Sequence, residues 1–214
     1  MKLTKLAILF FCIFNIISIS LALNSDSIVG MWLFDDGKGD TAKDSSGNGL
    51  DGTLINEPEW VDEGKFGGAL EFEFAKANNV RVPLPHNDTV TVAAWALFTG
   101  LPTTNIGLIH VQEGDVENAD PGSKTIGIWV ENTGTLWGRI IPKGQGNLNL
   151  PKNKSLDSDT WYHIAMVVDA DSGKATEYVD AEEVGSVDYP GQLNSYDFAN
   201  IGRQGNETWE GTID

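Results

Sequence analysis

The stretch from Thr160 to Ser186 constrains the fold most, because it predicts two β-strands joined by a tight polar turn. Residues 161–168 alternate between two faces and are apolar on both faces in the second half, as in a strand covered on two sides. Residues 169–174 read Asp-Ala-Asp-Ser-Gly-Lys, in which Asp and Ser can bond their own backbone and Gly accepts a positive φ. Residues 175–179 return as a second strand. The stretch therefore predicts a β-hairpin.

The remaining chain repeats this pattern of short apolar or alternating runs separated by segments rich in Gly, Pro, Asn and Asp. No segment after the N-terminus shows a sustained helical period. The expected strands cover residues 27–34, 52–54, 66–74, 80–84, 89–98, 107–112, 125–131, 136–142, 161–169, 175–179, 183–187 and 198–202. Such spacing predicts an all-β fold, an antiparallel β-sandwich, although composition alone does not separate a sandwich from a barrel.

The N-terminus has the three parts of a secretory signal peptide. Lys2 and Lys5 precede an apolar run, and Ser20-Leu21-Ala22 provides small residues for cleavage after Ala22. We therefore expect residues 1–22 to be a signal peptide and the protein to be secreted, extracellular or on the cell surface. The alternative is an uncleaved membrane anchor, but the apolar run is shorter than the ~20 residues that span a bilayer. The single cysteine, Cys12, lies in this segment, so residues 23–214 can form no disulfide.

The charge of the chain is strongly negative, with 14 basic and 31 acidic side chains and a formal charge of −17. Cleavage after Ala22 removes Lys2 and Lys5 and no acid, which leaves 12 basic and 31 acidic side chains, or −19. Phosphate binding requires a basic surface, so nucleic acid is disfavoured as a partner. Solubility explains most of the acidity. Some carboxylates could also be cation ligands.

Several sequence blocks, taken in order, resemble laminin-G-like jelly-roll domains of the concanavalin A-like lectin/glucanase superfamily. They are residues 31–39 (MWLFDDGKG), 44–54 (DSSGNGLDGTL), 67–72 (GGALEF), 90–95 (VTVAAW), 161–165 (WYHIA), 178–181 (YVDA), 200–203 (NIGR) and 211–214 (GTID). The resemblance covers nearly all of residues 23–214 and implies one concanavalin A-like jelly-roll domain. It also implies a strand after Asp214 that this sequence lacks, so we expect the domain to be incomplete at its C-terminus. A further departure is Ala181, where the family usually has Gly.

Asp and Asn side chains in Gly-rich loops are typical ligands of calcium. Asp44 and Asn48 lie in one such loop, and Asp35 and Asp214 end the first and last strands, which commonly run side by side in a jelly roll. The resemblance supports a structural calcium ion here, with Asp35, Asp44, Asn48 and Asp214 as ligands. The alternative is that these side chains only cap turns.

Sugar binding requires aromatic faces and nearby amides. Trp32, Trp95 and Trp161 are predicted to lie in the core. Aromatic residues in or near loops are predicted to be freer, and they are Trp60, Trp137, Trp209, Tyr189 and Tyr196. The Asn/Gly-rich stretch 144–149 offers polar partners, so Trp137, Asn147 and Asn149 are the candidate ligand-binding residues. The alternative is packing at the edge of the sandwich.

Catalytic signatures are weak. Glu71 and Glu73 are the nearest approach to the paired carboxylates of a glycosidase, and two solvent-facing Glu residues on a strand are the simpler interpretation. His163 is predicted to be a packed, hydrogen-bonded strand residue. We therefore expect a non-catalytic module that binds a glycan or an extracellular protein, with a calcium ion. The alternatives are an adhesion spacer in a larger surface protein and a glycoside hydrolase-related domain.

Overall fold

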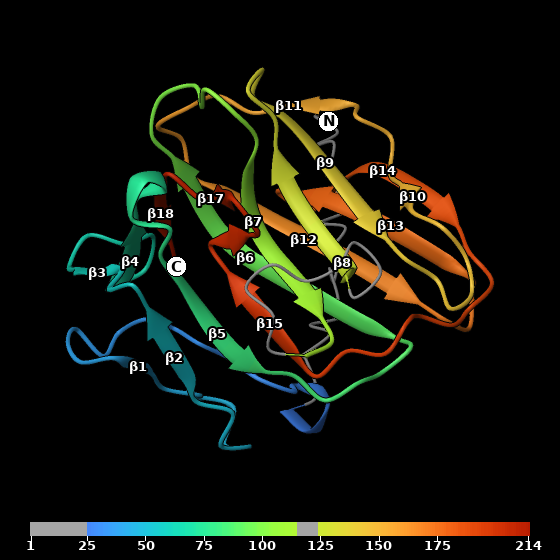
Figure 1. Ribbon diagram of the computed structural model, residues 1–214, viewed down its shortest axis with the longest axis horizontal. Coiled ribbons are helices and arrows are strands. Elements are labelled where there is room, and N and C mark those ends of the chain that lie inside the picture. Colours follow the sequence, from blue (N-terminus) through green and yellow to red (C-terminus); the bar gives the residue numbers. More distant parts are fainter. Residues whose placement is uncertain (1–24, 115–123) are drawn as a thin grey trace, which may run out of the picture.

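A computed structural model describes residues 25–114 and 124–214, which form an antiparallel β-sandwich of two large sheets (Figure 1). The nine-stranded sheet has the order β1-β2-β5-β15-β7-β8-β9-β10, and β11 also pairs with β9. Its strands are β1 Thr41–Ala42, β2 Gly52–Ile55, β5 Asn79–Pro83, β15 Phe198–Ile201, β7 Ile106–Gln112, β8 Lys124–Val130, β9 Thr135–Ile140, β10 Leu148–Asn149 and β11 Lys154–Ser155.

The seven-stranded sheet has the order β14-β13-β12-β6-β18-β4-β3 and lies behind the first in the view of Figure 1. Its strands are β14 Glu182–Asp188, β13 Lys174–Val179, β12 Tyr162–Asp169, β6 Val90–Phe98, β18 Gly211–Ile213, β4 Ala69–Phe72 and β3 Glu59–Val61. The other secondary-structure elements of the described residues are short. They are the hairpin of β16 Arg203–Gln204 and β17 Glu207–Thr208, and the 3-10 helices η1 Ser25–Ser27 and η2 Phe74–Lys76. The predicted all-β sandwich is confirmed.

The predicted hairpin is present as β12 and β13, paired from Ile164 opposite Val179 to Asp169 opposite Lys174. Its turn uses the expected chemistry, because the Asp169 carboxylate accepts hydrogen bonds from the Asp171 N–H and the Ser172 hydroxyl. These bonds, with the side-chain bond from Ser172 the strongest, lower the pKa of Asp169.

The predicted first strand over residues 27–34 is wrong. Only Trp32 makes a β-bridge, to Asp44. Phe34 has a φ of 52°, a left-handed conformation that ends any extended run. The indole of Trp32 donates to the Leu50 carbonyl, so side-chain bonds to the following loop replace strand pairing here.

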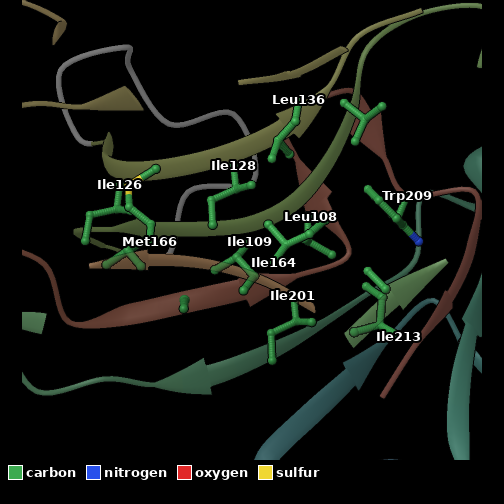
Figure 2. Packing of buried hydrophobic residues seen from close by; sticks show 14 of the residues in the cluster. Leu108, Ile109, Ile126, Ile128, Leu136, Ile164, Met166, Ile201, Trp209 and Ile213 are labelled. Carbon is green, nitrogen blue, oxygen red and sulfur yellow. The ribbon is translucent and has the colours of Figure 1, made fainter. Parts of the chain in front are cut away.

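The core lies between the sheets (Figure 2). Ile126, Ile128 and Leu136 of the nine-stranded sheet face Ile164 and Met166 of the seven-stranded sheet, and all are buried. Alternation explains this arrangement, since every second residue of a strand points to the same side. The intervening residues of β8 and β9 therefore point away from the core and form an outer face.

The C-terminal strand β18 lies within its sheet, paired on one side with β4 and on the other with β6. Ile213 and the preceding Trp209 are fully buried. The expectation that a further strand is missing after Asp214 is not tested by this arrangement. The predicted signal peptide, residues 1–22, lies outside the described residues. Within residues 25–114 and 124–214, no helix is long and apolar enough to cross a membrane.

Candidate functional site: the outer face of the nine-stranded sheet

One line of paired residues crosses the outer face of the nine-stranded sheet, and we call it the outer row. The chain neighbours of its members, among them Val80, Val82, Ile126 and Ile140, lie in the core, so the row points away from it. In spatial order it consists of Arg81 on β5, Asn200 on β15, His110 on β7, Gly127 on β8, Arg139 on β9 and Asn149 on β10. The row is polar and carries two arginines.

A stacked pair of tryptophans adjoins the row. Trp129 on β8 and Trp137 on β9 are directly opposite each other, with ring centroids 4.6 Å apart and an interplanar angle of 17°. A Cβ atom at Gly127 would overlap the six-membered ring of Trp129, so the glycine leaves room for that ring to lie along the strand. Cross-strand aromatic pairs of this kind stabilise a sheet surface.

Arg139 is held between this pair and a neighbouring amide. Its guanidinium carbon lies 4.9 Å from the Trp137 ring centroid and 5.4 Å from that of Trp129. Its Nε donates a 2.9 Å hydrogen bond to the Asn149 side-chain oxygen. Burial lowers the pKa of Arg139, and the carboxylate of Glu207 opposes this. We call Trp129, Trp137, Arg139 and Asn149 the Trp–Arg cluster.

Two more charges border the Trp–Arg cluster. The ammonium of Lys152 lies 4.7 Å from the Trp137 ring centroid and forms an ion pair with Glu131. This lysine therefore covers a face of Trp137 and is already neutralised by a carboxylate. Arg139, in contrast, forms no ion pair with any residue in the described part of the chain.

The Trp–Arg cluster has more hydrogen-bond donors than acceptors. Among residues 25–114 and 124–214, no partner is found for the terminal amino groups of Arg139 or for the buried indole N–H groups of Trp129 and Trp137. A buried donor without a partner costs free energy. Because the two indole N–H groups are buried, the partly exposed head of Arg139 is the part of the cluster that suits a ligand with oxygen acceptors.

The opposite outer face, on the seven-stranded sheet, carries a second aromatic group. Trp95 on β6 lies 5.5 Å from Phe66 and 5.4 Å from His163 between ring centroids. The ammonium of Lys65 lies 4.6 Å from the Trp95 ring. Phe66 is 73% exposed and Trp95 is partly exposed. We call Lys65, Phe66, Trp95 and His163 the Trp95 platform.

The structure reverses several predictions about aromatic residues. Trp95 and Trp161 were predicted in the core but are partly exposed, and Trp95 lies on an outer face. Trp209, Tyr189 and Tyr196 were predicted to be freer but are buried. The position of Trp95 is explained by the register of its strand. Its neighbour Ala96 is in the core cluster, and Ala94 lies on the same side as Ala96, so Trp95 points outward. Trp32 and Trp60 are partly buried against the core.

Among the predicted ligand-binding residues, Trp137 and Asn149 are brought together through Arg139. Trp137 lies within β9 and is 8% exposed, so it is no loop residue. Asn147 is exposed before β10, and no contact of its side chain is found within the described ranges. Sequence reasoning missed Trp129 and Arg139. The spacing Trp137-Gly138-Arg139 was the available signal, since residues two apart on a strand share a face.

The predicted metal ligands fall into two separate pairs. Asp44 accepts hydrogen bonds from the N–H groups of Met31, Ser46 and Leu50 and from the Ser46 hydroxyl. Burial alone would raise the pKa of Asp44, but these bonds outweigh it and lower the pKa to about 2. Asn48 donates to the carbonyls of Ile28 and Val29. Both side chains therefore organise the loop of residues 44–50.

Asp35 and Asp214 instead each bind the turn of residues 64–68. Asp35 Oδ1 accepts from the Gly68 N–H and Asp214 Oδ2 from the Phe66 N–H, both at 2.8 Å. The second oxygen of each carboxylate has no hydrogen bond from the described residues. No cluster of three or more His, Cys, Asp or Glu side chains that could hold a metal occurs within residues 25–114 and 124–214. Two carboxylates alone are fewer than the roughly six to eight oxygen ligands that calcium takes.

The candidate carboxylate pair does not form a cleft. Glu71 on β4 is exposed and lies opposite Glu59. Glu73 follows β4 and forms an ion pair with Lys76. His163 is partly exposed, and its backbone N–H donates to Asp180. These positions agree with solvent-facing charges on a strand and its end.

Comparison with known proteins gives a family and a set of similar folds. The family described as the concanavalin A-like lectin/glucanases superfamily matches residues 72–214. No curated protein matches the chain.

Three solved structures illustrate the fold. Domain 4 of AbnA, a GH43 extracellular arabinanase from Geobacillus stearothermophilus in complex with arabinotriose, has a TM-score of 0.62 at 20% identity over 87% of this chain and 88% of that one. The binding domain of botulinum neurotoxin DC in complex with SialylT has a TM-score of 0.60 at 11% identity, covering 88% and 47%. Trypanosoma rangeli sialidase in complex with sialic acid has a TM-score of 0.60 at 16% identity, covering 84% and 28%. At these identities the likeness shows the fold alone.

Proposed function

The chain belongs to the concanavalin A-like lectin/glucanase superfamily, and from this premise we propose that it is a secreted, non-catalytic module that binds glycans on the outer face of its nine-stranded sheet. Secretion in this proposal rests on residues 1–22, whose sequence has the pattern of a signal peptide. The fold alone does not assign a function, so the proposal depends on the site.

The observation that carries the proposal is the Trp–Arg cluster. It combines two stacked indoles with a guanidinium fixed by Asn149 and with donors that lack partners among the described residues. Glycans present many hydroxyl oxygens around apolar ring faces. Trp129 is 2% and Trp137 is 8% exposed, so the indoles support the site from beneath. The partly exposed head of Arg139 is the group that a glycan oxygen can reach, and its fixed position would orient the ligand.

The solved relatives add support by analogy. The arabinanase domain is described in complex with arabinotriose, and it covers nearly the same length as this chain. The neurotoxin binding domain is described in complex with SialylT. Binding domains on this fold thus include glycan binders.

An extracellular protein ligand and a spacer role are the alternatives, and each differs from glycan binding in what the Trp–Arg cluster must do. If the domain were only a spacer, nothing would require hydrogen-bond donors that lack a partner. A protein partner would bind a broad patch and would not need a row of polar residues. A hydrolase would require two carboxylates across a cleft, and Glu71 and Glu73 do not provide them.

We also propose a structural calcium ion at the turn of residues 64–68, held by Asp35 and Asp214 with backbone carbonyls. Each carboxylate has a second oxygen free of hydrogen bonds from the described residues. Asp44 is a poor candidate because four donors already bind its oxygens. Asn48 is likewise occupied by the loop.

A glycan array probed with the purified chain tests the main proposal. Trp137→Ala should lower affinity for any bound glycan by about ten-fold or more, the loss typical of a central aromatic contact. Trp95→Ala, on the opposite face, should change it by less than about two-fold. Trp137→Phe provides a milder variant if the alanine variant melts early. No signal for the unmodified chain on any glycan would instead support the spacer role.

Thermal melting tests the calcium ion. If free calcium is 100 times Kd, binding should add about 2.7 kcal/mol, which corresponds to a rise of roughly 5–10 °C in Tm for a domain of this size. Asp35→Asn should abolish the calcium dependence, whereas Asp44→Asn should lower Tm and keep it. An identical melting curve with chelator and with calcium would contradict the proposal.

A further inference from the structure

We propose that the glycan bound on the outer row is acidic, an anionic polysaccharide whose charged group is held by the Arg139 fork. This inference rests on the proposed glycan binding and names the class of ligand for the same site. It follows from the state of Arg139, from the acidity of the chain and from the partial exposure of the arginines in the row.

Arg139 is arranged to receive an anion. The Asn149 oxygen holds its Nε at 2.9 Å, and the two indoles hold its plane. The terminal amino groups have no hydrogen-bond partner and no ion pair in the described part of the chain. A guanidinium fork binds a carboxylate or a sulfate through two parallel hydrogen bonds, and here its orientation is set before the ligand arrives.

The chain as a whole is acidic, yet Arg139 has no carboxylate partner in the described part of the chain. The formal charge is −17, and several basic residues elsewhere are neutralised in ion pairs: Lys43 with Asp51, Lys76 with Glu73 and Lys174 with Asp188. Retaining an arginine without a carboxylate partner is costly in an apolar setting, and burial indeed lowers the pKa of Arg139. A ligand carboxylate would supply the missing countercharge.

Nearby carboxylates limit the positive charge of the face. Glu207 acts on Arg139 at a distance, and Glu131 pairs with Lys152. Neither occupies the fork. The electrostatic attraction for an anionic ligand is therefore confined to the guanidinium of Arg139, and the face is not a broad basic patch. Binding should then depend on an anionic group placed correctly in the ligand.

The two arginines of the outer row are partly exposed and lie far apart on the same face. Arg81 lies in the same row as Arg139, four strand positions away, which at the usual strand spacing is about 19 Å. Asn200 and His110 occupy the positions between, followed by Gly127 with the Trp129 ring over it. His110 is 1% and Trp129 is 2% exposed, so the accessible groups of the row lie toward its two ends, and Arg139 is the one that a ligand's anionic group would meet.

The experiment compares matched polysaccharides by titration calorimetry with the purified full chain. Polygalacturonate is compared with its methyl ester, which keeps the backbone and removes the charge, and dextran sulfate is compared with dextran. The first pair detects carboxylate recognition and the second detects sulfate recognition. At least one acidic member should bind about ten-fold more tightly than its neutral counterpart.

Arg139 variants then locate the recognition. Arg139→Gln should remove the preference for the acidic polymer, and Arg139→Lys should recover only part of it because a lysine has no fork. Lys65→Gln, which removes a cation from the Trp95 platform, should leave the preference unchanged. Circular dichroism melts of each variant show whether it is folded at the temperature of titration.

Three results have different meanings. A ten-fold preference lost in Arg139→Gln supports the inference. Equal binding of acidic and neutral members within both pairs overturns the acidic ligand and leaves glycan binding standing. Absence of binding to these four polymers and to every glycan of the array overturns the proposed function, and the inference with it.

Discussion

The two outer faces of the sandwich each carry tryptophan beside a basic side chain, but they hold these groups in different ways. On the nine-stranded sheet, Trp129, Trp137 and Arg139 all belong to paired strands. On the seven-stranded sheet, Lys65 and Phe66 come from a turn, and only Trp95 and His163 belong to strands. A side chain on a paired strand is fixed by the ladder, whereas a turn requires its own anchors.

The anchors of that turn are the carboxylates of Asp35 and Asp214. The Trp95 platform therefore depends on charge at the rim of the sandwich, and the Trp–Arg cluster does not. The outer face of the nine-stranded sheet, whose side chains are fixed by paired strands, therefore suits a preformed ligand site. On the seven-stranded sheet, the turn that carries Lys65 and Phe66 packs over Trp95. The following predictions test the two faces in order of decreasing expected effect.

The largest effect concerns Glu177 of β13, which lies in the core beneath the Trp–Arg cluster. It is 1% exposed, and a Cβ atom at Gly138, between Trp137 and Arg139, would lie 3.0 Å from its Oε1. Neither oxygen has a hydrogen-bond partner among the described residues, and burial raises the pKa of Glu177 to about 8. The folded protein thus binds a proton that the unfolded chain releases near pH 4.5.

Because the folded pKa is the higher one, the stability from protonated Glu177 is complete below about pH 4.5 and is lost as the pH rises toward 8. Glu177→Gln removes this loss. The difference in free energy of unfolding between variant and parent should therefore grow by roughly 3–5 kcal/mol from pH 4.5 to pH 8, as urea denaturation can measure. Glu183→Gln, an exposed position, is the control. A constant difference across this range would contradict a buried, unpaired carboxyl.

The second prediction separates the turn from the strands. Asp214→Asn weakens the hydrogen bond from the Phe66 N–H and should cost about 1.5 kcal/mol, the lower end for bonds to a charged acceptor. Amide hydrogen exchange at Phe66 should accelerate by about ten-fold, while the amides of Trp129 and Trp137 keep their rates. Equal acceleration on both faces would mean that the turn does not act as a local unit. Asp188→Asn, in an exposed ion pair, is the control.

The third prediction compares aromatic coupling on the two faces. A double-mutant cycle with leucine at Trp129 and Trp137 should give a coupling free energy of about 1 kcal/mol, typical of a packed aromatic pair. The same cycle at Phe66 and Trp95 should give less than half of this, because Phe66 is mostly exposed and borne by a turn. Chemical denaturation of the single and double variants measures both. A larger value for Phe66 and Trp95 would reverse the ranking of the faces.

Much of the fold followed from local pattern. The hairpin of β12 and β13 and the long strand β6 were predicted because alternation and turn residues are encoded within a few positions. Residues 27–34 failed because an apolar run alone cannot show that Phe34 adopts a positive φ. The outward position of Trp95 was not predicted either. Its strand, β6, is apolar on both faces around Trp95, so only packing against the partner sheet decides which face is buried.

The candidate site was harder to predict than the fold. Trp137 and Asn149 were named from composition, yet they are linked through Arg139, whose role depends on cross-strand pairing of β9 with β8 and β10. Asp35 and Asp214 bind the same turn, although Asp35 does not end a strand, and Asp44 and Asn48 serve their own loop. Which of the predicted residues come together depends on contacts between segments far apart in the sequence, and spacing along the chain does not reveal such contacts.

The smallest effect concerns the turn between β13 and β14, on the seven-stranded sheet only. Asp180 and Ala181 form a two-residue connection in which both have positive φ, 50° and 66°. This geometry suits the twist of a hairpin but strains a residue with a Cβ atom, and glycine is preferred at the second position. Ala181→Gly should therefore stabilise the protein by about 0.5–1 kcal/mol in urea denaturation. Ala75→Gly, in the exposed helix η2 without positive φ, should not stabilise it. Because Ala181 is exposed and belongs to a turn of the seven-stranded sheet, glycan affinity should stay unchanged. If Ala181→Gly does not stabilise the protein, the strain is relieved elsewhere in the hairpin.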